Sequence, residues 1–378
     1  PPAPITEAEP PPPPEPVIEP LTPAHLEGSP LNRVGLLLPL SAQSRGVRDV
    51  AESLLNAAEL AVFALGDPDL VLIPKDTGGA RAGGAAAAEA VLDEGAAVLV
   101  GPLFAEAVQG AAEIAGAREA PVLAFSTDPD VAGDGVYLVS FTAEAEVGAV
   151  VDFAVSQGLT RFAFLGPRSA FGASVLDALT VKAAQNGASV TVSLDYLPNG
   201  DMRAAAQALA ARQDSFDAVV LPEYGLRLRE LAALLPFYDV DPAVKQVMTL
   251  GLWGDLSVAR EPALAGAWFP APDPLGREPF ESAYNAAINR PPPRLAGLAY
   301  DAVTLAHGLF DDFRSEESVL GEGVFGVDGG LRIGPDGLPE RRLAIFSVSE
   351  GRFVLHARPG AGGAVEASDV AANVLANP

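Results

Sequence analysis

Short apolar runs alternate with helical segments along most of this chain. The first run, RVGLLLPL, spans 33–40, and after a polar turn apolar residues recur at spacings of three and four between Val50 and Leu65. That spacing predicts a helix packed on one side. Ala-rich helical segments then separate four more apolar runs, at 70–74, 96–101, 121–126 and 135–140. Because uninterrupted apolar runs suit strands covered on both faces, the pattern predicts a parallel, doubly wound α/β sheet.

The same alternation then starts again. Strands are expected at 160–166, 189–197, 216–222 and 245–251, with helices at 145–157, 171–186, 202–212 and 226–235. After a proline-broken stretch at 268–274 and two more helices, the runs 341–348 and 352–357 are separated by three residues, which predicts a β-hairpin. A chain of 378 residues suits two medium domains. We therefore predict two Rossmann-like lobes, with parallel doubly wound sheets, joined by a three-strand hinge.

Domain boundaries are expected where the pattern changes. Lobe 1 should comprise 32–141 and 272–322, and lobe 2 should comprise 142–271 and 323–358. The crossings then fall near Phe141, near Pro270–Pro272 and near Glu322–Gly323.

The two ends of the chain differ from the rest. Residues 1–30 contain 12 prolines and five glutamates, with no Lys or Arg. Such a segment buries too little apolar surface to fold, so 1–31 are predicted to form an extended, disordered tether. Residues 359–378 are predicted to form a flexible tail.

Composition argues against several functions. A net charge of −25 repels polyanions, so nucleic acid is not an expected partner, and no apolar run is long enough to cross a bilayer. Cysteine is absent, which excludes disulfides and thiolate metal sites. The three histidines are scattered at His25, His307 and His356, and the nucleophile-elbow, zinc-protease and phosphate-loop signatures are missing. We predict no catalysis, no metal and no cofactor.

Candidate binding residues follow the strands. In parallel sheets, ligands bind beyond the carboxyl ends of the strands, where backbone N–H groups and helix N-termini are available. The candidates are Ser41, Gln43, Asp76, Ser126 and Thr127 in lobe 1, and Arg168, Ser169, Phe171, Glu223, Tyr224 and Trp253 in lobe 2. Donors, acceptors and aromatic walls together suit a zwitterionic or amide-bearing small solute.

Several candidates also have a structural interpretation. Ser126, Thr127 and Glu223 equally suit the capping of a turn or helix. Tyr224 and Trp253 suit the core or the rim, and Arg168 suits a solvated loop. Asp301, inside a predicted helix, is expected to be a structural partner instead of a ligand contact.

The order of motifs resembles the type I periplasmic binding proteins, specifically the leucine-binding-protein group. The resemblance runs from about Arg33 to Ala357, and the segments that carry it are VGLLLPLS (34–41), KDTGG (75–79), VGPLF (100–104), AFSTDP (124–129), AFG (170–172), AYDAVTLA (299–306) and FGVDGGLRIGPDG (325–337). Two of these segments, LLLPLS and VGPLF, look most like the penicillin-binding-protein activator lipoproteins, whose folded domain sits on a stalk fixed to the outer membrane. Transporter members usually carry a serine where this chain has Ala105, and a tyrosine where it has Phe171.

This resemblance implies a non-catalytic, periplasmic ligand-binding protein. Its ligand would be a small amino-acid-like or amide-bearing solute held in the cleft between the lobes, and its partner a membrane permease of the ABC-transporter type. The alternative is an activator-like lipoprotein that regulates a peptidoglycan synthase by protein contact. In either case, contact with the membrane would come only through an N-terminal lipid anchor that precedes Pro1.

Overall fold

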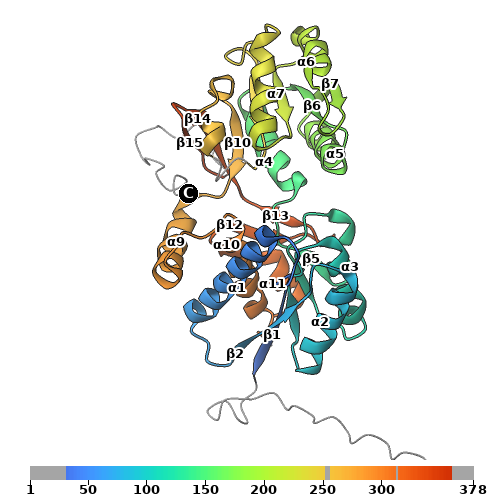
Figure 1. The fold of residues 1–378 in the computed structure, drawn as a ribbon, viewed down its shortest axis with the longest axis vertical. Coiled ribbons are helices and arrows are strands. Elements are labelled where there is room, and N and C mark those ends of the chain that lie inside the picture. Colours follow the sequence, from blue (N-terminus) through green and yellow to red (C-terminus); the bar gives the residue numbers. More distant parts are fainter. Residues whose placement is uncertain (1–30, 252–255, 312–313, 360–378) are drawn as a thin grey trace, which may run out of the picture.

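Two sheets, one in each lobe, form the framework of the protein (Figure 1). The structure is a computed structural model, and it describes residues 31–251, 256–311 and 314–359. The predicted tether and tail lie outside these residues, apart from one residue each, and so does Trp253. The predicted fold class is confirmed: each lobe is a mainly parallel sheet with helices on both faces.

The first lobe contains a five-stranded parallel sheet in the order β2-β1-β3-β4-β5. Helices α1 and α10 pack together on one face of this sheet, and α2 and α3 pack together on the other. Its elements are β1 (Asn32–Leu38), α1 (Arg45–Leu65), β2 (Leu70–Asp76), α2 (Arg81–Asp93), β3 (Val98–Val100), α3 (Ala105–Gly116), β4 (Val122–Ala124), β5 (Val136–Leu138), α9 (Pro274–Ile288), α10 (Ala296–Gly308) and α11 (Glu316–Glu322). The last five residues of strand β1 are all buried, as expected of a central strand covered on both sides.

The second lobe contains a seven-stranded sheet in the order β15-β14-β10-β9-β8-β6-β7. Helices α4 and α5 cover one face, while α6 and α7 lie on the other. Its elements are α4 (Ala143–Ser156), β6 (Arg161–Pro167), α5 (Ala170–Gln185), β7 (Ser189–Tyr196), α6 (Arg203–Ala210), β8 (Ala218–Leu221), α7 (Gly225–Phe237), β9 (Gln246–Thr249), α8 (Leu256–Ala259), β10 (Trp268–Ala271), β14 (Ala344–Ser349) and β15 (Arg352–Ala357). The last two strands form the antiparallel hairpin that the sequence indicated, and β14 joins the sheet beside β10.

A small antiparallel sheet was not foreseen. It consists of β11 (Val324–Gly326), β12 (Gly329–Ile333) and β13 (Pro339–Arg341). Asp301 of α10 accepts hydrogen bonds from the N–H groups of Val327 and Asp328, at 2.7 and 3.4 Å, and Leu138 N–H donates to the Gly337 carbonyl at 2.8 Å. These bonds place 324–341 with the first lobe and not, as the sequence suggested, with the second.

The chain consequently crosses between the lobes at 139–142, at 272–273 and at 342–343, and not near Glu322–Gly323. Two of the crossings lead straight into capped helices. Thr142 Oγ1 accepts from Ala145 N–H at 3.3 Å at the start of α4, and Asp273 Oδ1 accepts from Leu275 N–H at 3.0 Å at the start of α9. The direction in which each of these helices leaves the hinge is therefore fixed locally.

Arg341 joins two of the crossings. It is 7% exposed, donates hydrogen bonds to the carbonyl oxygens of Val139 and Ser140, and stacks over the Phe141 ring at 4.4 Å. Its Nη1 lies 3.6 Å from Asp301 Oδ2. Asp301 is thus a structural partner of the hinge.

Candidate functional site

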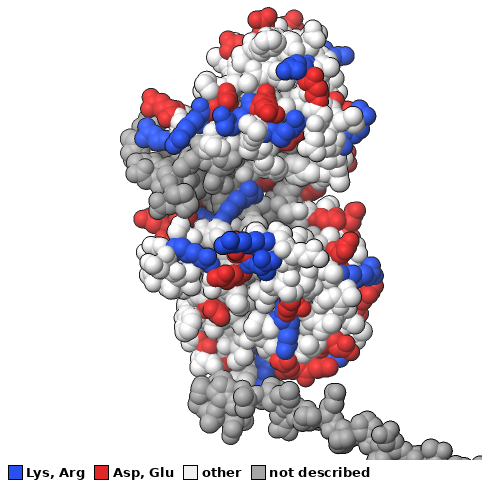
Figure 2. Space-filling model, viewed as in Figure 1, with Lys and Arg blue, Asp and Glu red and all other residues white. Residues whose placement is uncertain are grey.

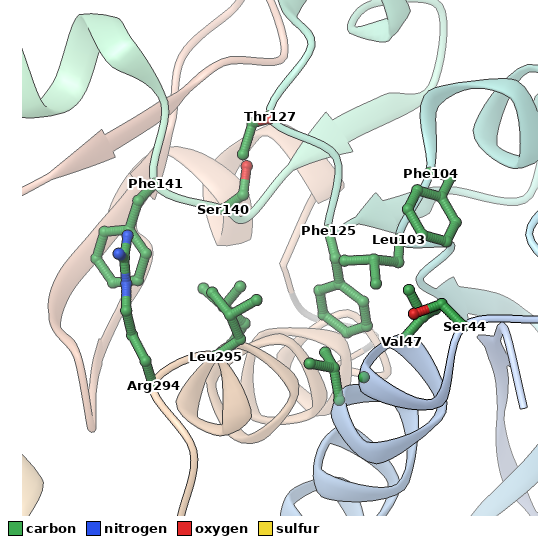
Figure 3. A pocket seen from close by; sticks show the side chains of 13 residues that line it. Ser44, Val47, Leu103, Phe104, Phe125, Thr127, Ser140, Phe141, Arg294 and Leu295 are labelled. Atoms are coloured by element: carbon green, nitrogen blue, oxygen red, sulfur yellow. The ribbon is translucent and has the colours of Figure 1, made fainter. Parts of the chain in front are cut away.

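A pocket of about 490 Å³ opens at the carboxyl edge of the first lobe's sheet, beside the hinge. Its walls come from the start of α1, the loops after β3, β4 and β5, and the start of α10 (Figure 3). The lining residues are Ser44, Gly46, Val47, Val50, Leu103, Phe104, Phe125, Thr127, Ser140, Phe141, Arg294, Leu295 and Leu298. Most of these side chains are apolar, and the volume suits a small molecule.

The electrostatic character of the pocket is positive. Of the lining residues that the structure describes, Arg294 is the one that carries a charge. Helix α1 begins at the pocket, has no acidic residue in its first turn, and its N-cap residue Ser44 makes no side-chain capping bond. The N-terminal N–H groups and the helix dipole therefore favour an anionic group here. In the view of Figure 2, basic and acidic side chains lie together on both sides of the gap between the lobes.

Arg294 also reaches the second lobe. Its Nη1 donates to the carbonyl oxygen of Gly251, which follows β9, at 2.8 Å. The backbone of Arg294 is held by the preceding prolines Pro291–Pro293 and by buried Arg277, whose Nη2 donates to the Arg294 carbonyl at 3.4 Å. Figure 3 shows the Arg294 side chain extending away from the start of α10. One cation thus contacts both the pocket and the opposite lobe.

The second lobe contributes an aromatic pair. Phe171, in the first turn of α5, and Tyr224, at the start of α7, have ring centroids 5.6 Å apart. Tyr224 is 43% exposed. Burial and the neighbouring Glu146 raise the pKa of the Tyr224 hydroxyl, so it remains a neutral hydrogen-bond donor. Both residues follow strands at the carboxyl edge of their sheet, as their sequence positions suggested.

Among the first-lobe candidates, Thr127 lines the pocket and the others form its surroundings. Ser41 N–H donates to Asp76 Oδ1 at 3.1 Å, which ties the loop after β1 to the loop after β2. Partial burial acts to raise the pKa of Asp76, but hydrogen bonds from Ser41 and Gly78 outweigh it and hold that pKa below its usual value. Ser126 is buried, and its Oγ accepts from Asp128 N–H at 3.1 Å, so it stabilises the turn. Gln43 is exposed, and its carbonyl accepts from Arg48 at 2.8 Å.

The polar candidates of the second lobe bond within that lobe. Arg168 Nε donates to Asp195 Oδ1 at 3.0 Å, and this pair is largely exposed. Glu223 Oε1 accepts a hydrogen bond from the Tyr196 hydroxyl at 2.8 Å. Ser169 caps α5 by accepting from Gly172 N–H. Trp253 lies outside the described residues.

Sequence reasoning missed most of the pocket lining. Ser44 and Val47 follow β1 just beyond the candidates that were chosen, so extending the strand-end rule into the first turn of α1 would have found them. Arg294 and Leu298 come from a helix that returns to the first lobe late in the chain, and no local motif marks them. Their position depends on how α10 packs against α1.

Two further observations concern the described ranges alone. No helix in them is both long enough and apolar enough to span a membrane. No three His, Asp or Glu side chains within 31–251, 256–311 and 314–359 gather as metal ligands would.

Two α/β lobes joined by three crossing segments, with a pocket where one lobe faces the other, define the molecule as a bilobal binding fold of type I. The family model described as "Periplasmic binding protein" matches residues 32–312. This chain belongs to that family, which confirms the resemblance seen in the sequence.

Solved structures share the fold over most of the chain. A putative branched-chain amino acid ABC transporter protein from Rhodospirillum rubrum is 19% identical, with a TM-score of 0.74, covering 86% of this chain and 99% of that one. A solute-binding protein from R. palustris in complex with benzoate is 18% identical, with a TM-score of 0.61 and coverages of 89% and 99%. A substrate-binding protein from Desulfitobacterium hafniense in complex with Leu is 17% identical, with a TM-score of 0.64 and coverages of 86% and 100%. No curated protein sequence is significantly similar to this chain.

Proposed function

We propose that this protein is an extracytoplasmic solute-binding protein that serves a membrane permease of the ABC-transporter type and performs no chemical conversion. Its ligand would be a small amino-acid-like or amide-bearing solute. The observation that carries this proposal is the pocket itself, an apolar cavity with Arg294 and the N-terminus of α1 at its edge, facing the aromatic pair of the other lobe.

The lining favours one part of that ligand class. A carboxylate would pair with Arg294 and the α1 N-terminus, while an apolar body would fill the space beside Phe125 and Leu298. Among the described residues, no acidic side chain lines the pocket, so an ammonium group gains little from them. Benzoate and leucine, which are the ligands in the two complexes with this fold described above, both join a carboxylate to an apolar group.

Phe171, Tyr224 and Thr127 are the sequence candidates that we retain as ligand contacts. The other candidates are proposed to shape the loops around the site, because their polar groups already bond to neighbours. A ligand that touches both lobes would bind the closed arrangement more tightly than the open one, and would therefore favour closure. The permease would bind the closed arrangement.

Calorimetric titration tests this function. The panel should contain branched and aromatic carboxylates, amino acids and primary amides. We expect one-to-one binding of at least one carboxylate with an apolar body. A folded protein that gives no binding heat with any member of the panel contradicts the proposal.

The activator-like alternative rests on a different observation. Ala105 at the start of α3, and Phe171 at the start of α5, supply no hydroxyl where the transporter members usually do. A protein of this kind, fixed by a lipid anchor, would contact a peptidoglycan synthase. Co-purification with a synthase and not with a permease, from cells in which contacts were crosslinked, would favour it over solute delivery.

A further inference from the structure

Glu146 is a buried acid of the second lobe that lies within the electrostatic influence of Arg294 of the first lobe. It lies near the start of α4 and is 4% exposed. Its carboxylate accepts a hydrogen bond from Gly251 N–H and experiences the positive charge of Arg294. Because the Gly251 carbonyl accepts from Arg294 at 2.8 Å, Gly251 links the acid of one lobe to the base of the other.

The Glu146 carboxylate is only partly satisfied. Its Oε1 is buried and has no hydrogen-bond partner among the described residues. A buried carboxylate with an unmet oxygen depends strongly on the nearby cation to remain ionised. A change in the charge that Arg294 presents must therefore change the protonation of Glu146.

We propose that Glu146 competes with the carboxylate of the ligand for Arg294, so that Glu146 takes up a proton when an anionic ligand enters the pocket. The inference rests on the proposed function, because it requires an anion beside Arg294. It assigns to Glu146 a positioning role, in which its negative charge attracts Arg294 in the absence of ligand and is lost in its presence. Arg294 suits this exchange because it lines the pocket and contacts the second lobe at the same time.

Other charged groups around α4 are engaged elsewhere. On α5, Lys182 pairs with Asp152 at 2.8 Å. On β13, Arg341 pairs with Asp301, and on β15, His356 lies against Phe153, toward the far end of α4. Tyr224 at the start of α7 interacts electrostatically with Glu146 and remains neutral. Among the described residues, Arg294 is thus the cation whose charge lowers the pKa of Glu146.

The pH dependence has a definite sign. Burial raises the pKa of Glu146 to about 7, against the lowering effects of Arg294 and Gly251 N–H. A ligand carboxylate that offsets Arg294 raises this pKa further, so the complex binds more protons than the free protein. For a rise of one unit, uptake is roughly half a proton at pH 7.5, and affinity increases about fivefold from pH 8 to pH 6.

Calorimetry with benzoate in two buffers of different ionisation enthalpy measures the uptake. We expect roughly half a proton per benzoate in the native protein at pH 7.5, and about none in Glu146→Gln. Glu144→Gln is the matched control, because Glu144 lies in the same turn and its Oε1 accepts from Ser174 instead, at 3.3 Å. It should leave the uptake unchanged. Benzoate binding without proton uptake overturns the competition while leaving the proposed function intact.

A second measurement needs no ligand. The carboxyl carbon of Glu146, identified in a ¹³C-labelled protein by its absence in Glu146→Gln, should titrate about one unit higher in Arg294→Gln than in the native protein. Identical titrations would refute the coupling whatever the ligand is. If the titrations differ but no member of the panel of carboxylates, amino acids and amides binds, the coupling stands and both the proposed function and the competition are overturned.

Discussion

Removing the Arg341 guanidinium should weaken the hinge more than any exposed charge change. The substitution Arg341→Met keeps most of the side-chain length, yet it removes the donors to the Val139 and Ser140 carbonyls and the cation over Phe141. It also leaves Asp301, which is fully buried, without its cation. Burial and the neighbouring Asp328 already raise the pKa of Asp301 and Arg341 opposes that rise, so the variant should hold Asp301 as the neutral acid.

The magnitude follows from these contacts. Breaking a buried ion pair by removing one partner costs about 3–5 kcal/mol, and the two hydrogen bonds are part of that loss and not additional to it. We expect Arg341→Met to lower the free energy of unfolding by about 4 kcal/mol. The double variant that carries both Arg341→Met and Asp301→Asn should lose less free energy of unfolding than the two single variants together. We expect this difference, the coupling energy, to be about 1–3 kcal/mol.

Urea unfolding followed by circular dichroism measures these free energies for the native protein, both single variants and the double variant. Arg352→Met is the control, because Arg352 is largely exposed and pairs with exposed Glu350 at 3.4 Å. A loss below about 1 kcal/mol for Arg341→Met, or additive single changes, would refute the claim that this network holds the hinge.

Three further predictions concern the site and the second lobe. Gly251 has φ +60° and a Cβ there would stand 2.8 Å from Tyr224 Cε1, so Gly251→Ala should cost about 1–3 kcal/mol in urea unfolding. Gly266→Ala, at φ +78° with nothing within 4 Å, should cost less, and equal costs would show that the contact with Tyr224 is irrelevant. The Arg161 hydrogen bond lowers the pKa of Asp217, so Asp217 stabilises the fold above the unfolded pKa of about 4 and loses this effect as pH falls through its folded pKa. The Asp217→Asn variant should therefore be less stable than the native protein at pH 7, and this difference in the free energy of unfolding should disappear in acid. A difference that stays constant with pH contradicts this prediction. Phe171→Ala should weaken benzoate binding about tenfold in calorimetry, because it removes one ring of the aromatic pair. Arg168→Ala, which removes the exposed partner of Asp195, should change the affinity by less than about twofold. The reverse order of effects would show that the ligand does not contact the aromatic pair.

The sequence predicted the sheets well because their strands are buried on both faces. The central strand β1 and the strands β6 and β8 are continuous apolar runs, and such runs have few alternatives in a chain of this length. The β14–β15 hairpin was equally clear from two apolar runs with a short connection, which is two residues long in the structure.

The small sheet of β11–β13 was not predictable in the same way. Its strands are short, two of them contain glycine, and β12 begins at Gly329, which has φ +88°. What holds this segment on the first lobe is long-range, namely the buried carboxylate of Asp301 and the contact of Arg341 with the crossing strand. Neither bond leaves a periodic signal in the sequence, and so the third crossing was placed about 20 residues too early.

The candidate site shows the same division. Strand-end reasoning pointed to the carboxyl edge of each sheet, where Thr127, which lines the pocket, and the pair of Phe171 and Tyr224 lie. It chose polar side chains, most of which proved to bond to neighbouring loops, such as Asp76 with Ser41. The apolar lining and Arg294 depend on tertiary packing between α1 and α10.

The central claim is that the first-lobe pocket holds the solute. Val47, half-buried at the pocket, can be changed to Trp to fill it from the rim, with Val181→Trp on α5 of the other lobe, 56% exposed, as the matched control. For whichever carboxylate the native protein binds in calorimetry, we predict at least a hundredfold loss of affinity in Val47→Trp, with unchanged far-ultraviolet circular dichroism, and no loss in Val181→Trp. Unchanged affinity in a folded Val47→Trp protein would contradict the account.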